Sequence, residues 1–91
     1  MTQIVVSPER LEAVARTFDD RKAETESILN GLRSTMQALD AEWDGVAQNK
    51  FYAQWNEMIP KMNQFTNLLG EIANELRRIA QVFRETDQNV I

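Results

Sequence analysis

Hydrophobic residues recur at helical spacing through the first half of this 91-residue chain. One series repeats every seven residues, and a second set of mostly apolar positions runs beside it. The series is Leu11, Phe18, Thr25, Leu32 and Leu39, and the second set is Val14, Ala15, Ile28, Leu29, Met36 and Trp43. Because positions that repeat every three to four residues share one face of a helix, this pattern predicts a long amphipathic helix.

The second half carries a cleaner pattern, in which the spacing alternates between four and three residues. Its members are Phe51, Trp55, Met58, Met62, Phe65, Leu69, Ile72, Leu76, Ile79 and Phe83. The spacing predicts a second helix of similar length. Pro60 falls off this apolar stripe, and proline removes a helical hydrogen bond and clashes with the carbonyl four residues earlier. We therefore expect a kink at Pro60, with a true break near residues 57–60 as the alternative.

Local signals predict where the helices begin and end. Ser7 can cap free backbone N–H groups, Pro8 suits the first helical position, and Glu9 favours the positive end of the helix dipole. The expected order is a helix over about 8–42, a turn at 43–45, a helix over about 47–87 and a tail at 88–91. Residues 1–91 would then form one all-α domain, a helix-turn-helix hairpin of two long antiparallel helices.

The apolar stripe is wider than two helices can cover by packing on each other. A lone hairpin would leave a long apolar strip in water, which monomeric proteins rarely do. We therefore expect two hairpins to pair into an antiparallel four-helix bundle dimer. A homodimer is the first expectation, and a heterodimer with a related chain is the alternative. The predicted hairpin and dimer core is Leu11, Phe18, Ile28, Leu32, Leu39, Phe51, Trp55, Met62, Phe65, Leu69, Ile72, Leu76 and Ile79.

Composition argues against several kinds of chemistry. The chain has no Cys and no His, so thiolate catalysis and the usual proton shuttle and zinc ligand are missing. Its net charge is -4 with both signs interspersed, which argues against a nucleic-acid surface. The acidic residues in 19–26 are not spaced like a calcium loop. We expect no enzyme activity, no catalytic residue, no cofactor and no metal site.

The sequence also shows no membrane-spanning segment and no secretory signal. No stretch is apolar enough to span a bilayer, and the first residues lack the basic start and cleavage site of a secretory signal. Taken alone, these observations predict a cytosolic protein without a stable membrane anchor.

Trp43-Asp44-Gly45 lies almost at the midpoint of the chain, between the two helical patterns. A chain of this length with a central Trp-x-Gly turn resembles the WXG family of small proteins exported by type VII (ESX) secretion systems. The resemblance implies a helical hairpin that dimerises and leaves the cell folded, without a cleaved signal peptide. It also implies recognition by a secretion ATPase, with the protein cytoplasmic before export and extracellular afterwards.

The resemblance assigns a bipartite export signal to both ends of the hairpin. Trp43 and Gly45 match the family's turn, and Phe83, Asp87 and Val90 match a motif after the second helix in which the family has Tyr where this chain has Phe. In an antiparallel dimer the turn of one chain would lie beside the tail of the other. The expected signal is therefore composite.

Structural roles for the same residues stay open. Trp43 can plug the end of the bundle, Gly45 can supply a left-handed backbone, and Phe83 can be the last core residue. Heptads alone fit an intracellular coiled-coil scaffold equally well. A membrane-active hairpin is a further alternative, which the even charge mixture disfavours.

Overall fold

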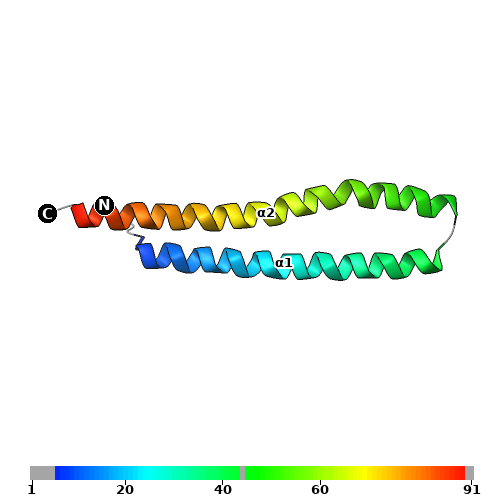
Figure 1. Cartoon of the computed structure of the whole chain (residues 1–91), viewed down its shortest axis with the longest axis horizontal. Helices are drawn as coiled ribbons and strands as arrows, with labels where there is room; N and C mark the ends of the chain where they lie inside the picture. Colours follow the sequence, from blue (N-terminus) through cyan, green and yellow to red (C-terminus); the bar gives the residue numbers. More distant parts are fainter. Residues whose placement is uncertain (1–5, 44, 90–91) are drawn as a thin grey trace, which may run out of the picture.

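A computed structural model describes residues 6–43 and 45–89, with side chains as far as residue 86. These residues form two antiparallel helices, α1 (Pro8–Glu42) and α2 (Val46–Asn89), with no strand between or beside them. Figure 1 shows a rod in which the connecting turn lies at one end, and the start of α1 and the end of α2 lie at the other. Its dimensions are 72 × 24 × 18 Å. The predicted all-α hairpin is confirmed.

The start of α1 is fixed by its first few residues. Ser7 has extended backbone angles, and its hydroxyl accepts a hydrogen bond of 3.1 Å from the N–H of Arg10. Pro8 occupies the first turn, where its missing N–H leaves no bond unmade. At the other end Trp43 takes extended angles, and its N–H donates to the Leu39 carbonyl at 3.0 Å.

α2 continues through Pro60 as one helix. Figure 1 shows that the helix changes direction in the yellow-green part of its ribbon and bows away from α1 there. A proline inside a helix forces such a bend, because its ring displaces the preceding turn. The structure therefore contains a bend at this level of α2 and not two separate helices.

The contact layer between the helices is built mainly from small residues. Ala15, Ala73 and Ala80 are fully buried, and Thr66, Leu29 and Met36 are nearly so. The α2 members are spaced by seven, and Tyr52 and Ile59 continue the same row towards the turn. Small side chains let two helix backbones approach closely, so the inner row of α2 differs from the row of large apolar residues that the sequence pattern emphasised.

Polar contacts along one flank set the alignment of the two helices. Arg77 pairs with Asp19, and Arg84 pairs with Glu12. Nearer the turn, the Arg33 guanidinium donates to the Asn63 side-chain oxygen at 3.2 Å. These side chains are long and partly exposed, so they select the alignment more than they stabilise it.

The opposite flank of the hairpin is apolar and largely uncovered. Among the predicted core residues, Ile28 is 62% exposed and Phe65 is 54% exposed. Leu32 and Phe51 are also exposed, whereas the remaining nine are half-buried: Leu11, Phe18, Leu39, Trp55, Met62, Leu69, Ile72, Leu76 and Ile79. A single hairpin thus buries only part of the predicted core.

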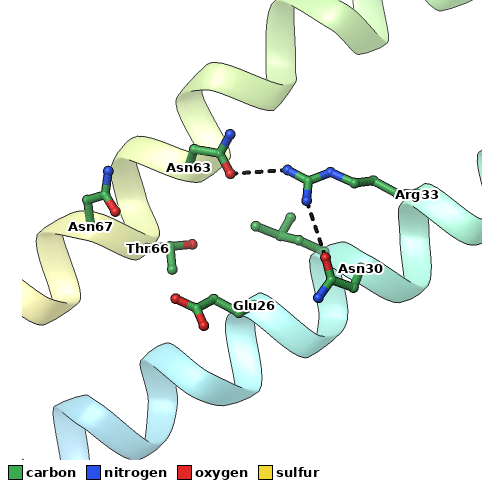
Figure 2. Close-up of a pocket in the computed structure, with 7 residues that line it drawn as sticks. Glu26, Asn30, Arg33, Asn63, Thr66 and Asn67 are labelled. Atoms are coloured by element: carbon green, nitrogen blue, oxygen red, sulfur yellow. Dashed lines mark hydrogen bonds between the residues drawn. The ribbon is translucent and has the colours of Figure 1, made fainter.

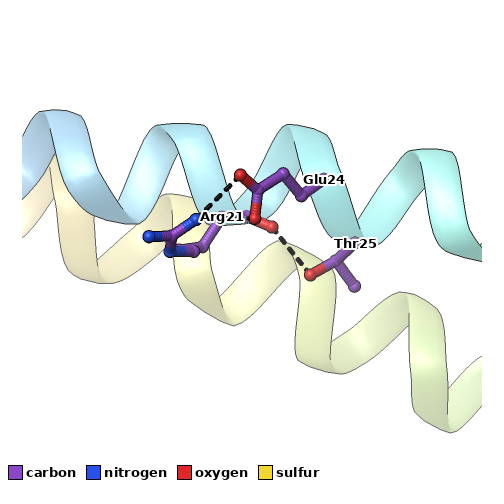
Figure 3. Close-up of polar contacts among 3 residues, drawn as sticks. All are labelled: Arg21, Glu24 and Thr25. Atoms are coloured by element: carbon purple, nitrogen blue, oxygen red, sulfur yellow. Dashed lines mark hydrogen bonds and ion pairs between the residues drawn. The ribbon is translucent and has the colours of Figure 1, made fainter.

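The outward side of α1 is held by contacts within the helix. The Arg21 guanidinium donates to both carboxylate oxygens of Glu24, at 2.7 and 2.8 Å, and Figure 3 shows the two side chains facing each other. The Thr25 hydroxyl donates back to the Arg21 carbonyl at 2.7 Å. These three residues belong to the polar segment 19–26, which the structure shows as continuous helix.

Candidate functional site

The predicted turn motif lies at one extremity of the rod. Gly45 has a φ of +124°, a value that residues with a Cβ rarely adopt, and its carbonyl accepts from the N–H of Asn49 at 3.4 Å. Glycine is therefore required here to reverse the chain and begin α2. Asp44 lies outside the described residues.

Aromatic side chains pack behind this turn. The Trp43 ring is half-buried, with its centroid 5.7 Å from that of Phe51 at an angle of 48°. Phe51 in turn meets Tyr52 edge-on at 6.1 Å. Such tilted contacts between rings are favourable, so Trp43 closes the end of the hairpin while part of its ring stays accessible.

Two polar contacts lock the same region. The Tyr52 hydroxyl donates to the Met36 carbonyl at 2.6 Å, and the Gln48 amide donates to the Asp40 carboxylate at 2.6 Å. Burial raises the pKa of the Tyr52 phenol, and the nearby Asp40 charge raises it further. These contacts hold α1 and α2 together next to the turn.

The other half of the predicted signal lies at the far end of α2. Phe83 is 41% exposed, and Arg84 next to it reaches Glu12 and Glu9 of α1, the latter at 3.8 Å. These pairs tie the end of α2 to the start of α1. Asp87 is within α2 but its side chain lies outside the described residues, as does Val90 entirely.

The two halves of the predicted signal do not meet within one chain. Trp43 and Gly45 lie at the turn, whereas Phe83 lies near the opposite end of a rod 72 Å long (Figure 1). A signal that uses both halves needs either two separate contacts or a second chain.

A polar groove runs between the helices on the flank away from the apolar residues. It has a volume of about 440 Å³, and Figure 2 shows Arg33 bridging Asn30 and Asn63 at 3.2 Å each, with Glu26 nearby. Within the described residues no group of three acidic side chains gathers to hold a metal ion.

Sequence reasoning missed several residues that shape this hairpin. The buried Thr66, Ala73 and Ala80 were not predicted, and neither was the contact from Tyr52 to α1. Their spacing of seven residues is visible in the sequence, but alanine and threonine occupy exposed helix positions equally well. The charged partners at Asp19–Arg77 and Glu12–Arg84 carry no sequence signal either, because their pairing depends on how the helices align.

Neither helix, over the residues that the structure describes, contains a stretch long and apolar enough to cross a membrane.

Comparison with known proteins identifies a family for this chain. The profile of the WXG100 family, described as proteins of 100 residues with WXG, matches residues 3–88. The chain is 32% identical over 90 residues to an ESAT-6-like protein of Streptococcus agalactiae, covering 99% of this chain and 94% of that protein. It is 30% identical over 90 residues to the type VII secretion system extracellular protein A of Staphylococcus aureus, covering 99% and 93%.

Solved structures match the hairpin over almost its full length. The secreted protein EsxB of Bacillus anthracis superposes with a TM-score of 0.82 at 34% identity, covering 96% of this chain and 99% of that one. EsxA of Geobacillus thermodenitrificans superposes with a TM-score of 0.83 at 26% identity, covering 99% and 97%. The resemblance drawn from Trp43-Asp44-Gly45 is confirmed, and the chain belongs to the WXG100 family of helical-hairpin proteins.

Proposed function

We propose that this chain is a substrate of a type VII secretion system, exported as a folded antiparallel dimer without a cleaved signal peptide. Its family and the names of its relatives support this function over an intracellular scaffold. In this proposal the chain has no enzymatic activity, is cytoplasmic before export, and is recognised by the secretion ATPase.

The uncovered apolar flank supports the dimer. Ile28 and Leu32 of α1 are exposed, and so are Phe51, Met58 and Phe65 of α2. Apolar surface of this extent favours association, because burial removes it from water. A second copy of the same hairpin offers a matching flank of the same length, so we propose a homodimer in place of a heterodimer.

The separation of the two signal halves is the observation that supports a composite signal. Trp43 and Gly45 lie at one end of the rod and Phe83 near the other. Two hairpins packed with their turns at opposite ends would place the turn of each copy beside the tail of the other. The proposed signal then combines Trp43 and Gly45 of one copy with Phe83, Asp87 and Val90 of the second copy.

Co-expression of two defective copies tests this composite arrangement. A chain with Trp43→Ala and a chain with Asp87→Ala, produced separately, each form dimers in which both ends are defective. Produced together, they form mixed dimers in which one end combines an intact turn with an intact tail. We expect neither variant to reach the medium alone and both to appear there when co-expressed.

The matched control places both substitutions in one chain, co-expressed with the unmodified chain. Every end of that mixed dimer has one defective half, so a composite signal predicts that the doubly substituted chain stays in the cell. Its appearance in the medium would show that the signal lies within one chain. Gel filtration of each variant checks that dimers still form, because Trp43 also packs on Phe51.

A further inference from the structure

α2 carries a second feature on its uncovered side, next to the apolar flank. We call the outer row the residues Gln54, Lys61, Leu68, Glu75 and Val82, and the apolar row the residues Phe51, Met58, Phe65, Ile72 and Ile79. Members of each row are spaced by seven and so lie along one line of the helix. All outer-row residues are exposed, and Leu68 is 48% exposed although it is apolar.

The two charged residues of the outer row lie symmetrically about Leu68. Lys61 and Glu75 each lie seven residues from it, on opposite sides, and carry opposite charges. If the helix is turned end for end about Leu68, Lys61 falls on the position of Glu75. A second α2 packed antiparallel in this register would therefore bring together two pairs of opposite charges.

The apolar row supports the same register independently. Reversal about Leu68 brings Phe65 to within one residue of Ile72, and Met58 to within one residue of Ile79. One residue is about 1.5 Å along a helix, so large apolar side chains would alternate along the contact. The midpoint of α2 (Val46–Asn89) falls between residues 67 and 68, so this register also overlaps the two helices over their whole length.

The symmetry of a dimer restricts which helices can meet. When two hairpins stack face to face with their turns at opposite ends, the two-fold axis crosses the rod and places each helix on its own copy. The alternative, with both turns at one end, places α1 on α2. Since Lys22 lies beside Gly70 within the chain, that alternative would set Lys61 and Glu75 near the level of Gly31 and Thr17, which carry no charge.

We infer that α2 packs antiparallel against α2 of a second copy, with Leu68 at the two-fold axis and Lys61 of each copy paired with Glu75 of the other. This inference rests on the proposed homodimer and adds its register. Lys61 makes no ion pair within the part of the chain that the structure describes, and Glu75 holds Arg78 of its own helix at 2.6 Å. A carboxylate has enough acceptor sites for a second cation.

The same register brings the proposed export signal together. Reversal about Leu68 places the end of α2 at the level of the start of α2 in the second copy, next to its turn. A slide by one heptad would separate these ends by about 10 Å and would put Lys61 opposite Leu68 or Val82.

Charge reversal tests the proposed ion pairs. Lys61→Glu creates two contacts between like charges in the dimer, and so does Glu75→Lys. We expect each to raise the dimer dissociation constant about tenfold or more, and the double variant Lys61→Glu/Glu75→Lys to restore it. Lys50→Glu is the matched control, because Lys50 is exposed on α2 outside both rows. Equal effects at Lys61 and Lys50, or no restoration in the double variant, would contradict the pairing.

A single introduced cysteine tests the axis directly, because the chain has none of its own. Leu68→Cys places two thiols at the axis, where oxidation or a short bismaleimide is expected to link the two chains. Val82→Cys is the control, since Val82 has similar exposure in the same row and would face Gln54 of the second copy. Linkage at Val82 and not at Leu68 would overturn the register.

Sedimentation analysis distinguishes a failure of the proposed register from a failure of the proposed dimer. A dimer that neither links through Leu68→Cys nor responds to charge reversal would overturn the register and leave the proposed dimeric substrate standing. A chain that stays monomeric at all concentrations would overturn both.

Discussion

At the residue scale, the structure requires glycine at one position and only tolerates it at another. Gly45 has a φ of +124° at the turn, whereas Gly31 lies within α1 and has open space where a Cβ would be. We expect Gly45→Ala to destabilise the fold by about 1–2 kcal/mol, because alanine resists that backbone conformation.

Gly31→Ala is the matched substitution, and we expect it to stabilise the protein by up to about 1 kcal/mol because alanine favours the helix. Urea unfolding of both variants at equal protein concentration provides the comparison. Two variants of equal stability would contradict the assignment of strain to the turn.

Tyr52 joins the helices near the turn through one hydroxyl. Tyr52→Phe removes the hydrogen bond to the Met36 carbonyl and keeps the ring, so we expect the melting temperature to fall by a few degrees. Thr35→Ala is the control, because the Thr35 hydroxyl donates only to the Gly31 carbonyl one turn earlier. A larger loss at Thr35 than at Tyr52 would show that the contact across the helices adds little.

The residues that sequence reasoning missed have a common cause. Ala73, Ala80 and Thr66 are buried although their side chains are small. A small side chain has little hydrophobic signal, so its burial follows from the alignment of two helices and not from its own chemistry. Large residues such as Phe65 lie on the apolar stripe of the sequence, but the stripe alone does not say which of them a single hairpin covers.

At the element scale, helix boundaries depend on short local signals. Ser7 and Pro8 begin α1, and Gly45 precedes α2, so these helix ends can be predicted from the sequence without knowledge of tertiary contacts. The ion pairs between the helices cannot be predicted in this way. Arg84 and Glu12 are 72 positions apart in the chain, and only the closed hairpin brings them together.

The open end of the hairpin is expected to loosen in acid. The hydrogen bond from Arg84 lowers the pKa of the Glu12 carboxyl below its ordinary 4.5. A lowered pKa in the folded state contributes stability above the ordinary value, and that contribution is lost as the pH falls through the lowered one. The other charged groups around this pair are Glu9, Arg16 and Arg77.

Glu12→Gln removes this contribution at neutral pH. We expect the variant to melt below the unmodified chain at pH 7, and the difference to shrink as the pH falls below 4.5 and Glu12 becomes protonated. Circular dichroism melts across this range measure the difference. A difference that is constant with pH would mean that the Glu12 charge does not hold the end of α2.

At the scale of the whole molecule, the sequence defines a rod with one apolar flank and one polar flank. The two-helix hairpin was predictable because both helices are long and strongly periodic. The sequence also predicted that Trp43 lies at the turn and Phe83 near the opposite end of the hairpin, and the structure has both residues there. In our proposal a second chain brings these residues together, and the register of that contact could be proposed only once the structure had defined the bounds of α2.

Export is the measurement that tests the proposed function most directly. The tagged chain is expressed in a host with an intact type VII system and in the same host lacking the secretion ATPase, and medium is compared with lysate. We predict that the chain, at its full length, appears in the medium only when the ATPase is present. Equal amounts in the medium of both hosts, or retention in both while a native substrate is exported, would contradict the proposed function.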